Sequence, residues 1–323
     1  MNIWKELNQY ISKQKQDSPE SCQKIFHGPS GAISGLETLH IHRMANLLFV
    51  ITYRRLPGEE LSELIEILSE NFPGHYLRIQ ERGNGLATDL YASEAMPEHL
   101  TIKEENLTFY IHPRRGQNIG FFPDMVNGRK AVRDHLNKLI LPGRVLNLFS
   151  YTCAFSVTAL KAGALRVDNW DMNRTSLRIG KENHILNSLD PRYKASRYFP
   201  YDIFKSLGKI RRNGPYDLVI MDPPPFHGSH FLYRKDYPGL IRRLPEWLNK
   251  GGASLLCLNA SDCSWEEFEQ IIKDSLPGHF NKWEKIRVPD KYVGRIADRG
   301  LKTFLLTGWE SRDSVNPVST LEH

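Results

Sequence analysis

The chain has 323 residues and a net charge of +6, with 40% hydrophobic and 25% charged residues. This length allows two domains, and the composition is that of an ordinary soluble globular protein. No apolar run approaches the roughly 18 residues that a membrane span needs. The first residues show no basic segment followed by an apolar core, so we expect no signal peptide and a cytoplasmic protein.

The cysteines and the basic residues bear on ligands and partners. The four cysteines are Cys22, Cys153, Cys257 and Cys263. They form no CxxC pair and no metal-ligand spacing with histidine, so we expect reduced thiols and no metal site. Arginines occur in four adjacent pairs, which together with the positive net charge suit a polyanionic partner such as nucleic acid. Each pair taken alone fits a solvated surface equally well.

The first part of the chain predicts a small α+β domain. Residues 47–53 form a β-branched and aromatic run, which predicts a strand, and residues 107–112 predict another. Residues 59–70 carry leucine and isoleucine at helical spacing after a Pro-Gly turn signal. The glycine-rich segment 26–35 can contact a phosphate, or it can simply join two strands.

From residue 128 the chain alternates regularly between helical and strand patterns. Helices are expected around 131–139 and over 154–162, 174–189, 204–210, 235–248 and 265–275. Strands are expected over 144–150, 166–172, 195–203, 216–222, 253–258, 283–288 and 303–307. Repeated β–α units of this size require a mostly parallel sheet covered by helices, and the last two strands suit an antiparallel pair. We predict an α/β fold with a Rossmann-like seven-stranded sheet and a smaller N-terminal α+β domain.

Unusual residues follow the first strand of this sheet, at its carboxyl edge, where ligands of doubly wound folds bind. The segment Asn147–Cys153 contains no GxGxxG, so a dinucleotide pyrophosphate would lack its glycine cradle. S-adenosylmethionine has no pyrophosphate and needs only a turn and a hydroxyl for its carboxylate. Tyr151 and Thr152 precede a predicted helix N-terminus and are placed for that carboxylate.

Acidic residues end the second and third strands. Asp171 lies at the spacing expected for a carboxylate that holds ribose hydroxyls, whereas Asp168 lies earlier on the same strand. Asp202 can accept a hydrogen bond from an adenine amino group. Each of Asp171 and Asp202 could instead cap a helix. The three strand ends together favour S-adenosylmethionine as the cofactor.

The fourth strand ends in Asp222-Pro-Pro-Pro-Phe226, which predicts a rigid loop after the ladder stops. Asp222 and a proline carbonyl can accept from an N–H of a flat base, and Phe226 can stack on its ring. Methyl transfer from a sulfonium then requires chiefly in-line positioning. Methylation of a cytosine carbon would instead need a thiolate. Cys257 lies in an apolar run and is expected to be buried; Cys263 follows that strand and can reach the site or be a loop cysteine.

These segments resemble a known family, the bacterial large-subunit (23S) ribosomal RNA methyltransferases that make 7-methylguanine or 5-methylcytosine, with their uncharacterised relatives. The matching segments are Asn147–Thr152, Asp171–Thr175, Asp222–Phe226, Gly116–Asp124 and Gly128-Arg129. The resemblance covers about 116–310, and residues 1–115 contain no RNA-binding domain of a type that we recognise.

The resemblance implies a set of site residues. The residues implied at the cofactor are Phe122, Asp124, Asn147, Ser150, Tyr151, Thr152, Asp171 and Asp202. Those implied at the substrate are Asp222, Pro223 and Phe226. The chain departs from the family at two positions: Cys153 stands where many relatives have glycine, and Asn259 stands where the cytosine-modifying members carry their nucleophilic cysteine. The chain therefore looks more like the guanine-modifying branch.

The resemblance and the residues together predict a methyltransferase that modifies a base nitrogen of ribosomal RNA. Two other classes remain open: a methyltransferase that acts on a protein or small molecule, and a non-catalytic protein that binds S-adenosylmethionine. We expect a domain over 1–115 that docks substrate, a methyltransferase domain over 116–310, and a tail over 311–323. The tail ends in Leu321-Glu322-His323, which looks like the start of a histidine tag.

Overall fold

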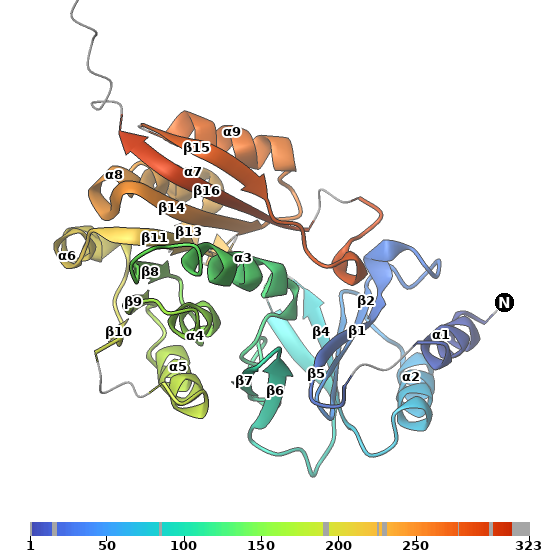
Figure 1. Cartoon of the computed structure of the whole chain (residues 1–323). Coiled ribbons are helices and arrows are strands. Elements are labelled where there is room, and N and C mark those ends of the chain that lie inside the picture. The colour runs from blue at the N-terminus through green and yellow to red at the C-terminus, as the bar shows by residue number, and fades with distance from the viewer. Residues whose placement is uncertain are drawn as a thin grey trace, which may run out of the picture. The chain divides into compact units, whose positions relative to one another are not determined.

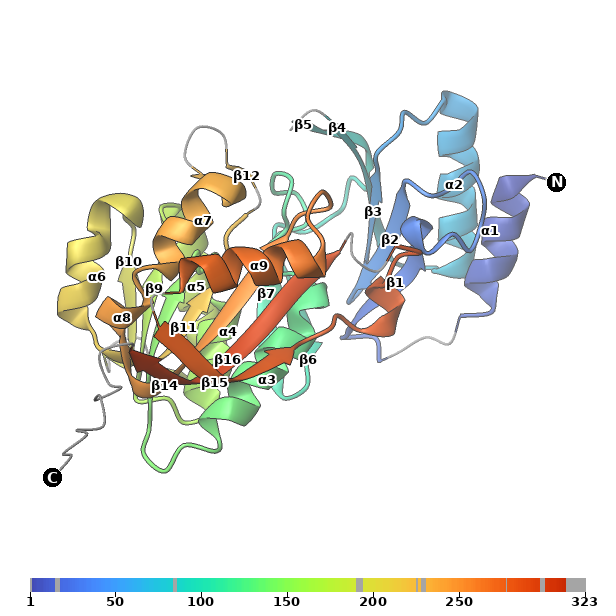
Figure 2. The same ribbon diagram turned by 90° about the horizontal axis from the view of Figure 1, so that it is seen from above.

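A computed structural model describes residues 2–14, 18–83, 86–189, 194–224, 226–227, 231–276, 278–296 and 300–311, without the side chains of 226, 227 and 311. The chain divides into two compact units (Figure 1, Figure 2). The first unit comprises Met1–Val126, Glu182–Ser188 and Val288–Gly300, and the second comprises Asn127–Lys181, Leu189–Arg287 and Leu301–His323. The expected tail lies outside the described residues, apart from its first residue.

The first unit is built on a five-stranded sheet in chain order. Its strands are β1 (Cys22–His27), β2 (Leu39–Met44), β3 (Leu47–Thr52), β4 (Tyr76–Gly83) and β5 (Leu86–Ala92). Helices α1 (Ile3–Ser12) and α2 (Gly58–Asn71) pack on one face, around a core that includes Trp4, Leu64 and Ile79. The pair β3–β4 is parallel because α2 connects these strands; the other neighbours are antiparallel. A separate hairpin joins β6 (Leu100–Glu104) to β7 (Leu107–Ile111).

The boundary of the first unit follows from how the segment after β7 packs. The expected boundary is 115/116, whereas the compact units divide at 126/127. The N–H of His112 donates to the carbonyl of Ile119 at 2.7 Å, and the rings of Phe109 and Phe121 lie 5.0 Å apart. The short helix η2 (Pro123–Met125) ends this segment. The residues after 115 are therefore held by the first unit up to its end.

The second unit contains the seven-stranded sheet that the sequence predicts. Its spatial order is β10-β9-β8-β11-β14-β16-β15, in which only β16 runs antiparallel to both neighbours. The strands are β8 (Arg144–Leu148), β9 (Arg166–Trp170), β10 (Ser196–Phe199), β11 (Tyr216–Met221), β14 (Leu248–Asn259), β15 (Gly278–Lys285) and β16 (Leu301–Ser311). A two-stranded ribbon pairs β12 (Phe226–His227) with β13 (Phe231–Leu232). The predicted α/β sheet with its final antiparallel pair is confirmed.

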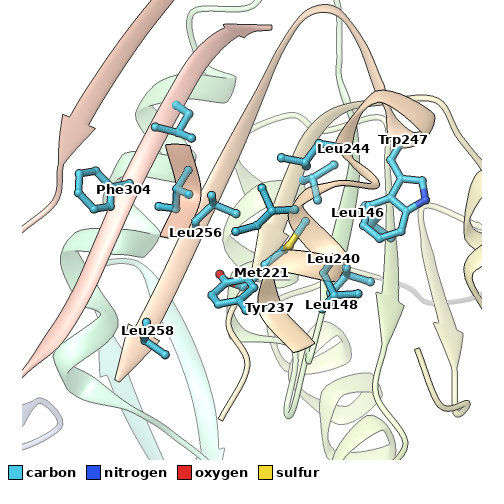
Figure 3. Packing of buried hydrophobic residues seen from close by; sticks show 14 of the residues in the cluster. Leu146, Leu148, Met221, Tyr237, Leu240, Leu244, Trp247, Leu256, Leu258 and Phe304 are labelled. Atoms are coloured by element: carbon cyan, nitrogen blue, oxygen red, sulfur yellow. The ribbon is translucent and has the colours of Figure 1, made fainter. Parts of the chain in front are cut away.

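Helices of the second unit follow its strands. They are α3 (Val126–Leu136), α4 (Ala154–Lys161), α5 (Arg174–Leu186), η4 (Phe204–Ser206), α6 (Leu207–Asn213), α7 (Tyr233–Ile241), α8 (Leu244–Trp247) and α9 (Trp265–Ser275). Figure 3 shows Tyr237 and Leu240 of α7 against Leu148 and Met221 of the sheet. Residues of α6, α8 and α9 join the same core. Burial of this apolar face stabilises the packing of these helices on the sheet.

The prediction of one helix over 235–248 is wrong. The segment forms α7 and α8 with a break at Arg242 and Arg243. Pro245 has no N–H, and its ring would clash with the carbonyl of the residue four positions earlier, so one continuous helix cannot form there. Among the described residues, no helix is both long and apolar enough to cross a membrane.

Candidate cofactor and substrate site

The strand ends of the second unit lie in one row. Phe199 pairs with Trp170, Trp170 with Leu148, and Leu148 with Met221. The residue after each of these positions therefore stands at the carboxyl edge of the sheet. Adjacent strands lie about 4.8 Å apart, so residues two strands apart are separated by about 10 Å. The register thus places Asp171 and the loop after Leu148 within a ligand's length of Asp222.

The loop after β8 has an unusual backbone. Phe149, Tyr151 and Cys153 alternate in the left-handed region, with φ of 55°, 46° and 63°. Residues with a Cβ are strained there, at a cost of roughly 1–2 kcal/mol each. N–H groups of this loop bond within the protein: that of Ser150 donates to the carbonyl of Trp170 at 3.0 Å, and that of Cys153 donates to the carbonyl of Ser150 at 2.8 Å. The loop leads directly into the N-terminus of α4, where further N–H groups are available.

Asp171 braces this loop. One carboxylate oxygen accepts from the N–H of Tyr151 at 2.8 Å, and the other accepts from the N–H of Asn173 at 2.8 Å. The side chain of Asn173, not Asp171, caps α5, because its oxygen accepts from Thr175 and Ser176 at 3.0 Å. The alternative that Asp171 caps this helix is therefore wrong. Its carboxylate ties the end of β9 to the loop after β8.

Asp202 makes the same kind of local bond as Asp171, to the N–H two residues further on. One of its oxygens accepts from the N–H of Phe204 at 2.9 Å, at the start of the short helix η4. The other lies 4.0 Å from the ammonium of Lys205. The N-cap of η4 is Ile203, without a side-chain cap bond, so Asp202 does not cap this helix. A contact with the adenine amino group stays a prediction, which the half-buried position of this carboxylate permits.

Buried polar side chains lie under the loop. The amide of Asn147 donates to Asn169 at 3.0 Å and is only 1% exposed, so it fixes the end of β8 inside the sheet. Thr152 is buried as well. The hydroxyl of Ser150 is buried beside the Cys153 thiol and has no oxygen or nitrogen partner among the described residues. A buried hydroxyl without such a partner is destabilising, and a carboxylate or amine of a bound cofactor would satisfy it.

Aromatic residues that the sequence analysis did not select line the same edge. Trp170 stacks on Phe199 with ring centroids 4.3 Å apart and planes 11° apart. Tyr201 is exposed, and the ammonium of Lys209 lies 4.3 Å from its ring centroid. The sequence does indicate the place of Trp170, because this residue directly precedes Asp171 at the strand end. Asp168 is fully buried and bonded to Tyr216 at 2.8 Å, so the choice of Asp171 over it agrees with their burial.

Asp222 follows the end of β11, and Pro223 beside it is buried. The fully buried Tyr237 donates its hydroxyl to the carbonyl of Met221 at 3.0 Å, which anchors the start of this loop. Burial and the nearby Asp222 carboxylate raise the pKa of Tyr237 well above its usual value, so the phenol remains a donor. The backbone of Phe226 belongs to β12, but its side chain lies outside the described residues.

The two cysteines near this edge are buried. Cys257 is fully buried in β14, as the apolar run predicts, with the Thr303 hydroxyl 3.7 Å from its sulfur. Cys263 is 2% exposed, and its thiol donates to the carbonyl of Ser264 at 3.5 Å. Burial raises the pKa of the Cys263 thiol to about 11, so almost none of it is ionised at neutral pH. Asn259 at the end of β14 is exposed.

Two residues that the resemblance implies at the cofactor belong to the first unit. Phe122 is 40% exposed and directly precedes η2, which contains Asp124. Their contact with a cofactor stays a prediction. Within the described part of the chain, no group of three or more histidine, cysteine or acidic side chains is arranged to hold a metal ion.

The fold and this edge define a class I methyltransferase: a seven-stranded sheet with a reversed last pair, no pyrophosphate cradle, and acids at successive strand ends. A family model described as "S-adenosylmethionine-dependent methyltransferase" matches residues 23–307. The chain therefore belongs to this family, whose cofactor is S-adenosylmethionine. The buried hydroxyl of Ser150, which has no oxygen or nitrogen partner among the described residues, fits that cofactor.

Similar proteins include named ribosomal RNA methyltransferases and a solved methyltransferase structure of the same fold. The chain is 35% identical to ribosomal RNA large subunit methyltransferase I of Aeromonas salmonicida over 143 residues, which is 44% of this chain and 35% of the relative. It is 27% identical to the Enterobacter sp. protein of that name over 272 residues, 81% of this chain and 66% of the relative. The chain thus spans less than two thirds of these relatives. A solved Streptococcus mutans methyltransferase shares the fold, with a TM-score of 0.80 and 22% identity over 95% of this chain and 82% of that one.

Proposed function

We propose that this protein methylates a base nitrogen of ribosomal RNA in the cytoplasm, with S-adenosylmethionine as methyl donor. The register that sets Asp222 one strand away from the Phe149–Cys153 loop carries this proposal. The curated relatives are named as large-subunit ribosomal RNA methyltransferases, and the net charge of +6 suits a polyanionic substrate. Substrate identity is part of the proposal because the chain spans only part of these relatives.

The cofactor side of the reaction requires binding and orientation. S-adenosylmethionine supplies, when bound, a methyl group already activated on a sulfonium. The Ser150 hydroxyl and the N–H groups at the start of α4 hold its carboxylate, and Asp171 accepts from its ribose hydroxyls. Asp202 accepts from its adenine amino group. The proposed cofactor contacts also include Phe122, Asp124, Asn147, Tyr151 and Thr152.

The substrate side requires an acceptor next to a nitrogen lone pair. The carboxylate of Asp222 and the carbonyl of Pro223 accept N–H groups of the base, which aims the lone pair at the methyl group. Phe226 stacks on the base and fixes its plane. A nitrogen that carries a hydrogen releases it as a proton when it gains the methyl group, and Asp222 takes up that proton. The Tyr237 hydroxyl holds the carbonyl of Met221 and thereby keeps Asp222 in place.

The state of the cysteines favours nitrogen over carbon as the methylated atom. A cytosine carbon is methylated only after a thiolate adds to the ring. Cys257 lies inside the sheet, and Cys263 is buried with a raised pKa of about 11. Asn259 occupies the position at which the family resemblance expects the nucleophile. A nitrogen needs no covalent intermediate.

Mass spectrometry of ribosomal RNA nucleosides from a deletion strain and its parent tests the proposal. We expect one methylated nucleoside to disappear and to return with the wild-type gene, but not with an Asp222→Ala gene. An Asp262→Ala gene is the control, because Asp262 is exposed and paired with Arg234. If no RNA nucleoside changes while the protein binds S-adenosylhomocysteine, the RNA assignment is wrong and a protein or small-molecule substrate remains. Binding of NAD(H) without a response to the thioether would contradict the cofactor assignment as well.

A further inference from the structure

A polar cluster lies in the first unit, on the face of the five-stranded sheet opposite α1 and α2. Lys24 of β1 points its ammonium between two histidines of β2: its Nζ lies 3.2 Å from Nδ1 of His40 and 2.9 Å from Nε2 of His42. Ile41, between these histidines, is fully buried in the core against the helices. Alternation along a strand therefore sends Lys24, His40 and His42 to the other face.

The hydrogen bonds of Lys24 fix what the histidines present. In its ammonium form Lys24 can only donate, and the ring nitrogens that face it then accept. Nε2 of His40 and Nδ1 of His42 then carry the hydrogen atoms. Neither of these nitrogens has a hydrogen-bond partner among the described residues. The cluster thus presents two oriented N–H donors, held in place by a cation beneath them.

Further side chains extend the cluster. The ring of His27 lies 5.2 Å from that of His40, and its Nδ1 is buried without a partner in the described part of the chain. The ring of Tyr53 lies 5.6 Å from His40 and is 55% exposed. Arg82 of β4 contacts Tyr53 and lies with its guanidinium 5.6 Å from the ring centroid of Phe49. The exposed ring of Tyr53 therefore lies between His40 and the guanidinium of Arg82.

Positive charge in the cluster comes from Lys24 and Arg82, and Asp124 is the acidic group that acts on Lys24. Burial, together with the Lys24 charge, lowers the pKa of His27 to about 4 and that of His40 to about 2. Burial also lowers the pKa of Lys24 to about 7, and Asp124 is the one acidic group that opposes this shift. The histidines are therefore neutral at neutral pH, and a buried charge such as that of Lys24 is unfavourable unless it is fully paired. An anion that accepts from these donors would remove that cost.

We propose that this cluster binds a phosphodiester group of the RNA substrate. The proposal rests on the proposed function in taking RNA as the substrate. A phosphodiester carries one negative charge and two free oxygens, which match the N–H groups of His40 and His42 and the guanidinium of Arg82. The exposed ring of Tyr53 lets an adjacent base stack, which a free phosphate cannot do. The first unit then holds the RNA backbone and leaves the chemistry to the second.

Two measurements on the full chain test this site. Fluorescence anisotropy gives the Kd for a short single-stranded RNA of mixed sequence as a function of salt. We expect Lys24→Met and Arg82→Gln each to weaken binding about tenfold and to lower the salt slope by about 0.7. Lys103→Met is the matched control, because Lys103 is exposed and paired with Glu20 in the same unit; it should leave the slope unchanged. Lys24→Met removes a buried charge, so it should not lower thermal stability.

The second measurement follows the histidine ring signals by NMR during titration with the same RNA or with inorganic phosphate. RNA should shift the signals of His40 and His42 but leave that of His279, an exposed residue of β15, unchanged. One outcome would be that RNA binds the wild type without shifting these signals and binds Lys24→Met with wild-type affinity and salt slope. In that case this site is wrong and the proposed function stands. If the wild type binds no RNA at any salt, the RNA function fails and this site with it. If inorganic phosphate shifts the signals and RNA does not, the RNA assignment of the site is overturned.

Discussion

Cys153 and Gly180 fit together behind the cofactor loop. Cys153 stands at a φ of 63°, which favours glycine, and its side chain points at α5. A Cβ built on Gly180 would lie 2.5 Å from the sulfur of Cys153 and 3.0 Å from its Cβ. The missing side chain at Gly180 therefore provides the space for the thiol. The departure of Cys153 from the family's glycine is accommodated inside the protein, on the side of α5.

We expect Gly180→Ala to destabilise the second unit. Alanine normally stabilises a helix interior by about 1 kcal/mol over glycine. Here its methyl group collides with a fully buried sulfur, so the free energy of unfolding should fall by about 1–3 kcal/mol. Urea unfolding measures this change, and calorimetry should show weaker binding of S-adenosylhomocysteine as the loop shifts. The control is Gly239→Ala in α7, where a Cβ has open space and stability should not fall.

The double variant Cys153→Gly with Gly180→Ala tests the same relationship in reverse. Glycine adopts the left-handed conformation without strain, and alanine then occupies part of the space that the thiol leaves. We expect this variant to recover most of the stability that Gly180→Ala loses. Strictly additive effects of the two substitutions would show that the residues do not interact.

The strands and helices of the second unit could be predicted because each has a clear period and a clear end. The predicted helix over 265–275 agrees with α9 at both ends. At its first turn the hydroxyl of Ser264 accepts from the N–H of Glu267. The helix over 235–248 failed because a local proline outweighed the hydrophobic pattern. In the first unit, strands β1, β2 and β4 were missed since their outer faces carry lysine, histidine and arginine that interrupt the alternation. Those same side chains form the polar cluster.

The candidate site could be predicted to the level of strand ends, but not to the level of individual contacts. Asp171 and Asp222 follow directly from where the strands stop. The stack of Trp170 on Phe199 depends on the register between β9 and β10, which no local pattern reveals. The buried amide pair of Asn147 and Asn169 depends on the same register across β8 and β9.

Substitution of Asp171 should separate cofactor binding from helix capping. Asp171→Ala removes the acceptor for Tyr151 N–H and the proposed ribose contact, so affinity for S-adenosylhomocysteine should fall by about 10- to 100-fold. Asn173→Ala removes the cap of α5 and should cost about 1 kcal/mol of stability with a much smaller loss of affinity. Isothermal calorimetry and thermal unfolding measure the two effects. Equal affinity losses in both variants would contradict the direct role of Asp171.

Substitution of Asp222 should affect turnover and not cofactor binding. Asp222→Ala removes the acceptor that aligns the base, so kcat should fall about 100-fold or more, with nearly unchanged affinity for S-adenosylhomocysteine. Cys263→Ala and Cys257→Ala should both retain activity, although Cys257→Ala loses stability because that side chain is fully buried. Transfer of a labelled methyl group to ribosomal RNA measures turnover. A folded but inactive Cys263→Ala, or a covalent adduct with a fluorinated cytosine, would show that carbon is the methylated atom.

The polar cluster predicts how stability of the first unit depends on pH. The groups that face Lys24 across its neighbouring elements are His27, His40, His42, Arg82, Asp124 and Tyr292. The histidines have folded-state pKa values below the 6.5 of an unfolded chain, and Lys24 has about 7 against 10.5. The unfolded chain therefore binds more protons than the folded chain between pH 4 and 6.5, and again between about pH 7 and 10.5. In both ranges the free energy of unfolding rises with pH.

Stability of the first unit should therefore fall as pH drops from 6.5 towards 4, and rise as pH increases from about 7 towards 10.5. Trp4 is buried in this unit, whereas the other five of the six tryptophans lie in the second, so 5-fluorotryptophan gives one ¹⁹F signal for it. Urea unfolding followed through that signal at several pH values measures the dependence. Lys24→Met should abolish the rise above pH 7 and keep the loss below 6.5, while Lys103→Met should change neither. A first unit whose stability is the same at pH 7 and pH 9 would show that Lys24 is not held at a lowered pKa.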